Sequence, residues 1–168
     1  VEYGGSTITQ QLVRLVTDEK EHSIQRKITE IFRAIELEQE YYTKEQILEA
    51  YLNIMPLTGN IVGVGAGANY YFGKGVEDLS LAECAVLASI TNNPSLYGPM
   101  STITITREDG STVTPREANK ERQEMILTRM AGGNDDVGVT GLTYLTEEEA
   151  EAAKAEELHF TDGTTSAQ

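Results

Sequence analysis

The stretch GGSTITQQLVR, residues 4–14, decides how the chain begins to fold. Thr7 is followed three residues later by Gln10, which is the spacing of a capping box, and an apolar run starts directly afterwards. This pattern predicts that a helix opens here and covers roughly residues 7–17. Two glycines stand before it, so flexible backbone leads into a helix N-terminus whose N–H groups suit an anion.

The polar side chains of this stretch could contact a sugar or a phosphate. Ser6, Thr7 and Thr9 carry hydroxyl groups, while Gln10 and Gln11 carry amides that can both donate and accept hydrogen bonds. The alternative is that Thr7 only caps the helix and Gln10 only closes the capping box. Local spacing alone favours this structural alternative.

Helix signals continue outward along the chain. Isoleucines at three- and four-residue spacing, Ser or Thr followed three residues later by Glu or Gln, and a stop at Pro56 are typical of helices. They predict helices at about residues 22–40, 43–55, 80–90, 115–130 and from 146 onward. A single alternating run, turned at Asp109-Gly110, predicts a small β-hairpin near residues 103–113. The fold is therefore expected to be mainly α.

Composition narrows the possible functions. The 168 residues carry a formal net charge of −14, which argues against nucleic acid and against simple electrostatic docking on an anionic membrane. No run of about 18 apolar residues exists that could span a bilayer. The single cysteine, Cys84, lies in an alanine-rich helical pattern where a small buried residue is expected. One domain over residues 1–158 and a flexible tail over residues 159–168 are expected.

The segment RKITE, residues 26–30, places three charged side chains on one helical face. Arg26 and Lys27 lie four and three residues before Glu30, so both cations can reach its carboxylate. We expect them to lower the pKa of Glu30 and keep it ionised. The same cations could bind a diphosphate while the carboxylate assists. The alternative is an exposed ion-pair cluster that contributes little.

Other patterns favour structure over chemistry. In KEQILEAYLN, residues 44–53, the apolar positions form a core stripe that includes Tyr51. The glycines of GVGAG, residues 63–67, are better explained by tight helix packing than by a dinucleotide-binding loop. The third glycine of the GxGxxG motif is absent, and no strand is predicted before the segment. His22 and His159 are far apart in sequence, so no metal site built from protein ligands is expected.

The order of these motifs resembles a known family. GGSTITQQ, RKITE, KEQILEAYLN, YYFGK and LSLAECAVLASITNNPSLYGP follow one another as in the peptidoglycan glycosyltransferase (transglycosylase) domain of class A penicillin-binding proteins, glycosyltransferase family 51. The resemblance covers about residues 4–155. It implies a lysozyme-like, mostly helical fold and an enzyme, a hexosyltransferase, that polymerises lipid II into glycan strands and releases undecaprenyl diphosphate.

The resemblance also assigns roles. It makes Glu30 the family's second essential carboxylate, next to the diphosphate, and Arg26 and Lys27 its basic partners. It places Ser6, Thr7, Gln10 and Gln11 along the substrate, together with Arg14, which stands where the family usually has Lys. No tightly bound cofactor is expected, although Mg²⁺ or another divalent cation could accompany the substrate diphosphate.

The chain also departs from the family pattern. The family's first motif, which carries the general-base Glu, does not occur in residues 1–168 and would fall before Val1. We therefore expect a domain truncated at its N-terminus and inactive by itself, because general-base catalysis typically contributes roughly 10²–10⁴-fold. Leu15, His22 and Thr29 replace polar or basic residues that the family usually has, so the site carries less positive charge.

The expected context is cell-wall synthesis. The resemblance implies a parent protein that is anchored in the bacterial membrane, works at its extracytoplasmic face, could be fused to a transpeptidase domain, and has lipid II and the growing glycan strand as partners. Two other interpretations stay open at this point. One is a remnant that binds or scaffolds lipid diphosphate without turning it over, and the other is a lysozyme-like hydrolase that uses Glu30 as its acid.

Overall fold

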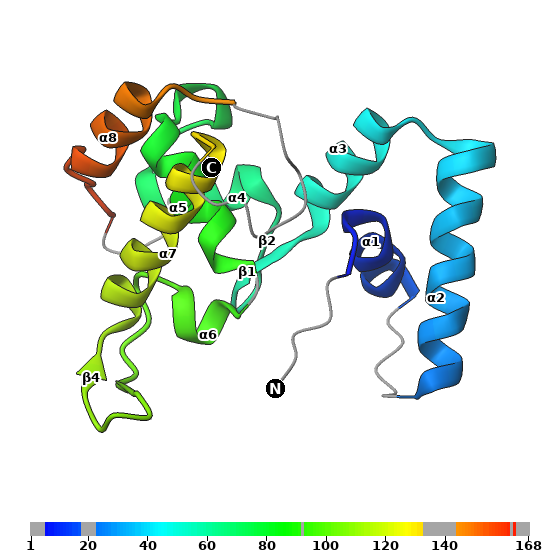
Figure 1. Ribbon diagram of the computed structural model, residues 1–168, viewed down its shortest axis with the longest axis horizontal. Helices are drawn as coiled ribbons and strands as arrows, with labels where there is room; N and C mark the ends of the chain where they lie inside the picture. Colours follow the sequence, from blue (N-terminus) through cyan, green and yellow to red (C-terminus); the bar gives the residue numbers. More distant parts are fainter. Residues whose placement is uncertain (1–5, 18–22, 92, 133–143, 162, 164–168) are drawn as a thin grey trace. The chain divides into compact units, whose positions relative to one another are not determined.

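The computed structural model describes residues 6–17, 23–91, 93–132, 144–161 and 163 (Figure 1). The chain divides into two compact units. The N-terminal unit comprises residues 1–55 and 62–64, and the C-terminal unit comprises residues 56–61 and 65–168. Each unit has its own packed helices.

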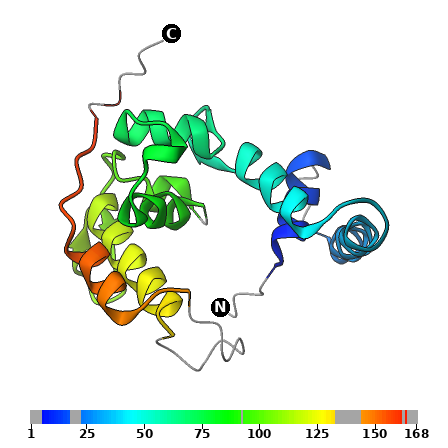
Figure 2. The same ribbon diagram turned by 90° about the horizontal axis from the view of Figure 1, so that it is seen from above.

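Within its described residues, the N-terminal unit consists of α1 (Ile8–Thr17), α2 (Ile24–Glu36), the π-helical turn η1 (Leu37–Tyr41) and α3 (Lys44–Ile54). Helix α1 packs against both α2 and α3, and Figure 2 shows α2, in blue, nearly end-on. The buried apolar side chains come from all three helices: Leu12, Val13, Ala34, Ile47, Tyr51 and Met55, which follows α3. This packing brings the start of α1 next to the first turns of α2.

Helix α2 forms as its isoleucine spacing predicts, but that spacing does not mark a buried face. Ile24, Ile28, Ile31 and Ile35 are each at least 37% exposed. The buried residues of α2 are Glu30 and Ala34, one helical turn apart. The face of α2 that packs inside the unit is therefore set by a charged residue and a small one.

The C-terminal unit is built around α5 (Leu81–Ile90), whose Ala82, Val86, Leu87 and Ile90 are almost completely buried. Helices α6 (Pro94–Tyr97), α7 (Pro115–Met130) and α8 (Glu147–Ala155) pack against α5 (Figure 1). The remaining elements of the described chain are α4 (Val64–Phe72), η2 (Val76–Asp78), and the short strands β1 (Pro56–Thr58), β2 (Ile61–Val62), β3 (Ile105–Thr106) and β4 (Thr112–Val113). Val62 of β2 and Val64 of α4 belong to the N-terminal unit. The mainly α fold that the sequence predicts is confirmed.

Local sequence signals account for most helix boundaries. Four capping boxes are formed as predicted: Thr43 with Gln46, Ser80 with Glu83, Thr114 with Glu117, and Thr146 with Glu149. The β-hairpin is also confirmed, since Ile105 pairs with Val113 in antiparallel register and Gly110 turns at φ +82°. A side chain at Gly67 would collide with Leu57, which confirms that tight packing explains this glycine.

Two expectations change in the C-terminal unit. Cys84 is exposed, so the prediction of a buried cysteine was wrong. Helix α5 is apolar on all sides, and its sequence therefore does not indicate which side faces solvent. Near the C-terminus, Phe160 lies 5.3 Å from Phe72 between ring centroids, and the Thr161 amide donates to the Tyr71 carbonyl at 2.9 Å. Packed residues thus extend into the segment 159–168 that the sequence predicts to be flexible.

Candidate active site

A charged cluster lies on the first two turns of α2. Ser23 caps this helix, because its Oγ accepts a hydrogen bond from the Arg26 amide at 3.1 Å. The cap fixes where α2 begins, and Arg26, Lys27 and Glu30 then project from one face as their spacing requires. Glu30 is only 3% exposed, so its carboxylate lies inside the unit rather than on the surface.

Each oxygen of the Glu30 carboxylate meets a different cation. Arg26 Nη1 lies 2.6 Å from Oε2, and Lys27 Nζ lies 2.5 Å from Oε1. Burial raises the pKa of Glu30, but the hydrogen bonds and charges of Lys27 and Arg26 outweigh it, and the pKa falls below its usual value. The Glu30 carboxylate is thus expected to be ionised at neutral pH. With two cations around one carboxylate, the cluster then carries a net positive charge.

Lys27 also joins α2 to the beginning of α1. Its Nζ donates to Ser6 Oγ at 2.8 Å and to Gln10 Oε1 at 3.3 Å, in addition to Glu30. Ser6 and Gln10 lie 21 and 17 residues before Lys27 in the chain. The structure thus brings the Ser6 hydroxyl and the Gln10 side-chain amide into contact with the RKITE face of α2. Sequence spacing alone did not show this contact.

Gln11 lies next to this group and connects it to α3. Its Nε2 donates to the Ser6 carbonyl oxygen at 3.4 Å, and the Tyr51 hydroxyl donates to its Oε1 at 3.0 Å. Sequence reasoning treated Tyr51 only as a core residue and missed this hydroxyl. The signal that could have found it is the residue type, because a buried tyrosine hydroxyl usually needs a hydrogen-bond partner.

Thr7 and Arg14, two of the residues expected to contact the substrate, lie at the margin of the charged cluster. Thr7 is exposed, and its Oγ1 accepts a hydrogen bond from the backbone N–H of Gln10 at 3.2 Å, so Thr7 caps α1. Arg14 lies one turn beyond Gln10 and is exposed. No hydrogen bond connects Arg14 to the cluster among the residues that the structure describes. His22 lies outside those residues.

The Arg26 guanidinium has one donor, Nε, that is not used within the described part of the chain. Its Nε is buried and has no hydrogen-bond partner among the described residues. A buried donor without a partner is costly, and it becomes favourable when a ligand oxygen accepts from it. The cluster therefore combines two cations, a hydroxyl, two amides and an unused guanidinium N–H, which together suit the oxygens of a phosphate or diphosphate.

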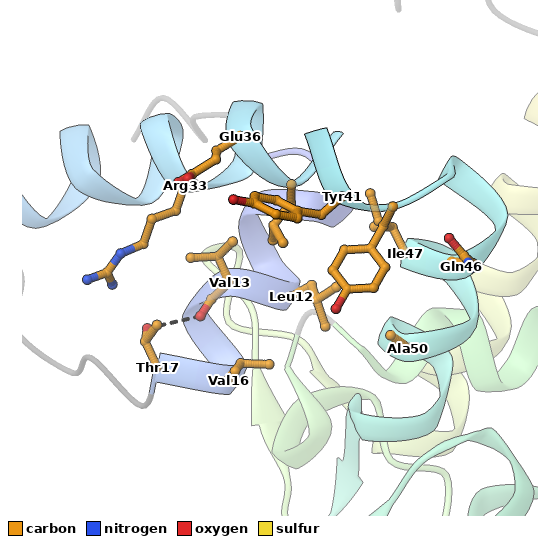
Figure 3. A pocket seen from close by; sticks show the side chains of 12 residues that line it. Leu12, Val13, Val16, Thr17, Arg33, Glu36, Tyr41, Gln46, Ile47 and Ala50 are labelled. Carbon is orange, nitrogen blue, oxygen red and sulfur yellow. Dashed lines mark hydrogen bonds between the residues drawn. The ribbon is translucent and has the colours of Figure 1, made fainter. Parts of the chain in front are cut away.

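The N-terminal unit also contains a cavity of about 570 Å³ on a different face of α1 (Figure 3). Its lining is mainly apolar, with Arg33 and Glu36 of α2 as its charged side chains. The lining residues are Leu12, Val13, Val16, Thr17, Arg33, Glu36, Leu37, Tyr41, Tyr42, Gln46, Ile47 and Ala50. A cavity of this volume can hold a small molecule or part of a larger ligand.

Comparison with known proteins identifies the class to which this fold and site belong. Residues 1–131 match the transglycosylase family. The chain is 37% identical over 136 residues to penicillin-binding protein 4 of Bacillus subtilis, a match that covers 75% of the chain and 22% of that protein. It is 38% identical over 153 residues to penicillin-binding protein 1A of Vibrio cholerae, covering 91% of the chain and 16% of that protein.

A solved structure agrees with these sequence matches. Penicillin-binding protein 1A from Haemophilus influenzae aligns with a TM-score of 0.54 and 28% identity, over 75% of this chain and 16% of that one. The chain belongs to the transglycosylase family of class A penicillin-binding proteins. The family expected from the order of motifs is therefore confirmed. The chain spans less than a quarter of the length of these relatives.

Proposed function

We propose that this chain forms the part of a peptidoglycan glycosyltransferase that holds the diphosphate of lipid II while glycan strands are polymerised. The observation that carries the proposal is the cluster of Glu30, Arg26 and Lys27 joined to Ser6 and Gln10. Undecaprenyl diphosphate is the leaving group, so negative charge develops on its oxygens as the bond to the sugar breaks. Preorganised cations and N–H donors stabilise such charge in the transition state.

Within this proposal, Glu30 orients the two cations. Its low pKa keeps it ionised at neutral pH, so it holds Arg26 and Lys27 in place without taking up a proton itself. Arg26 Nε is a further donor for a phosphate oxygen. This arrangement argues against a hydrolase in which Glu30 acts as the acid, because such an acid needs a raised pKa.

The apolar cavity fits an amphiphilic substrate. Lipid II combines a charged diphosphate with a long hydrocarbon chain, and the N-terminal unit offers both a cationic cluster and an apolar cavity of about 570 Å³. Binding the hydrocarbon part in the cavity would remove apolar surface from water and add to the affinity.

A divalent cation such as Mg²⁺ is proposed to accompany the substrate diphosphate. Both oxygens of Glu30 already accept hydrogen bonds from cations, so the carboxylate offers poor ligands to a metal. Among the described residues there is also no group of three or more His, Cys, Asp or Glu that could hold an ion.

The cellular setting is part of the same proposal. No helix in the described part of the chain is long and apolar enough to cross a bilayer. The relatives are much longer penicillin-binding proteins, and we propose that this domain works at the extracytoplasmic face of the bacterial membrane within a larger, membrane-anchored protein. A transpeptidase domain is the expected further part, and lipid II and the growing glycan strand are the expected partners.

Residues 1–168 by themselves are expected to bind the substrate without polymerising it, because they contain no match to the family's general-base motif. The test compares two proteins, residues 1–168 and the same residues preceded by a family first motif. Both should bind lipid II, and only the second should make glycan. Polymerisation by residues 1–168 alone would contradict the expected inactivity, and absence of lipid II binding by both would contradict the proposed function.

A matched pair of variants links the result to the cluster. Glu30→Gln removes the charge that holds Arg26 and Lys27. Glu83→Gln removes a similarly buried carboxylate in the C-terminal unit, which pairs with Lys74 at 2.7 Å. Glu30→Gln should weaken lipid II binding, whereas Glu83→Gln should leave it near the original value. Equal effects of the two changes would mean that general destabilisation, not the cluster, controls binding.

A further inference from the structure

Tyr51 lies in the core of the N-terminal unit, but its hydroxyl serves the charged cluster. The residue is on α3 and only 8% exposed. Its hydroxyl donates to Gln11 Oε1 at 3.0 Å, across 40 residues of sequence. A phenylalanine would fill the same apolar space, so packing alone does not require the hydroxyl.

The Tyr51 hydroxyl and the Ser6 carbonyl together hold the Gln11 amide in one orientation. Because Oε1 accepts from Tyr51, Nε2 faces the other way and donates to the Ser6 carbonyl at 3.4 Å. The reversed amide would place its oxygen against that carbonyl oxygen, which is unfavourable because both are acceptors. The Gln11 amide is therefore held between a hydroxyl of the core and the backbone of Ser6.

The hydrogen bonds continue from Gln11 to the charged residues. Gln11 holds the backbone of Ser6, and Ser6 Oγ accepts from Lys27 Nζ at 2.8 Å. Lys27 in turn contacts Glu30 at 2.5 Å. Networks of this kind keep polar groups in one geometry before a ligand binds, which lowers the cost of binding.

We infer that Tyr51 is a positioning residue that holds the Ser6 segment, through Gln11, in the geometry that binds the substrate diphosphate. The inference rests on the proposed function of the cluster. Tyr51 itself does not touch the diphosphate. Its hydroxyl acts by keeping Gln11 and Ser6 in place, so its removal should change binding more than it changes the fold.

The first measurement needs no ligand. The side-chain amide of Gln11 is observed by ¹⁵N–¹H NMR in the 168-residue protein and in Tyr51→Phe. The variant should shift the two Gln11 Nε2 proton signals and speed their exchange with water. Unchanged signals would overturn the inference, whatever the protein binds. Tyr71→Phe is the matched control, because Tyr71 is a 1% exposed tyrosine of the C-terminal unit that is hydrogen-bonded to Thr58.

The second measurement is binding of a lipid II analogue with a short prenyl chain. Tyr51→Phe should raise the Kd about tenfold, which is the scale of one lost hydrogen bond. In a Gln11→Ala background the same substitution should have little further effect, because the two residues act as one unit. Full additivity of the two changes would show that Tyr51 acts on the fold rather than through Gln11.

The outcomes separate this inference from the function on which it rests. Lys27→Ala is the reference variant for a lost phosphate contact. If Lys27→Ala weakens binding and Tyr51→Phe does not, the inference fails and the proposed function stands. If the unmodified protein does not bind the analogue at all, the proposed function fails, and the NMR comparison still decides whether Tyr51 orients Gln11.

Discussion

Lys27 Nζ lies 2.8 Å from Ser6 Oγ and 2.5 Å from Glu30 Oε1, so one ammonium group connects the beginning of α1 to the buried carboxylate of α2. The Lys27 side chain is 37% exposed, whereas the Glu30 side chain is 3% exposed. The cation therefore stands between the carboxylate and solvent, where an incoming anion would meet it.

Replacing Lys27 by Met tests this position. Met keeps most of the chain length and removes the charge, so Glu30 loses one of its two cations and its pKa should rise. Affinity for inorganic pyrophosphate, measured by titration calorimetry, should fall roughly tenfold or more, because a charge-assisted hydrogen bond contributes about 1.5–3 kcal/mol. Lys120→Met, in the C-terminal unit, is the control and should bind as the unmodified protein does. Similar losses in both variants would argue against a site at Lys27.

The depressed pKa of Glu30 predicts how stability depends on pH. A carboxylate whose pKa is lower in the folded state stabilises the fold above its unfolded pKa, and this contribution is lost as pH falls through the folded pKa. The unmodified protein should therefore lose stability faster than Glu30→Gln as the pH is lowered from about 6 to 3. Urea denaturation at each pH measures the difference.

The control for this pH dependence is an ion pair of the same spacing that is only partly buried. Glu124 lies 3.5 Å from Lys120, four residues earlier, and these side chains are 47% and 36% exposed, far more than Glu30. Such pairs contribute about 0–1 kcal/mol, so Glu124→Gln should change the free energy of unfolding little at any pH. A pH dependence of Glu30→Gln that parallels the unmodified protein would contradict the ionised state of Glu30.

These residues also show what the sequence could and could not predict. The i,i+3 and i,i+4 spacing of RKITE predicted the contacts around Glu30, because helix geometry is local. The contacts of Lys27 with Ser6, and of Tyr51 with Gln11, depend on how α1 packs on α2 and α3, which no local pattern encodes. The order of the motifs pointed to the family, but it did not show which side chains touch.

The same contrast holds for burial. Capping residues defined the starts of four helices because the signal lies within one turn. The isoleucine stripe of α2 indicated a helix, yet its members are exposed and Glu30 is buried. Periodicity shows that a helix has an apolar face, but it does not show whether another segment covers that face.

Cys84 provides a prediction about reactivity. The residue is exposed, but partial burial of its thiol and the charge of Glu83 raise the pKa of Cys84 above the usual value. Less thiolate is present at pH 8, so alkylation by iodoacetamide should be slower than for an unstructured cysteine peptide. Glu83→Gln should speed the reaction, because it removes the negative charge that helps to raise the pKa of Cys84. Reaction as fast as that of the peptide would contradict the raised pKa.

The apolar cavity predicts a distinction between two ligands. Ala50 lines the cavity, and Phe at this position would occupy part of its volume of about 570 Å³. Ala50→Phe should weaken binding of a lipid II analogue with a long prenyl chain, because less apolar surface is removed from water. Affinity for inorganic pyrophosphate should stay unchanged, since Ala50 is not among the residues of the charged cluster. Parallel loss of both affinities would show that the cavity does not hold the hydrocarbon chain.

Two glycines of α4 predict opposite effects of the same substitution. A methyl group at Gly67 would collide with Leu57, which is completely buried, so Gly67→Ala should destabilise the protein by about 1–3 kcal/mol. At Gly65 the nearest atom to an added methyl is Val76 Cγ2 at 3.9 Å, which leaves room for it. Gly65→Ala should therefore stabilise by up to about 1 kcal/mol, because Ala favours the helix. Urea denaturation of both variants measures the difference, and equal stability would mean that Leu57 moves aside without cost.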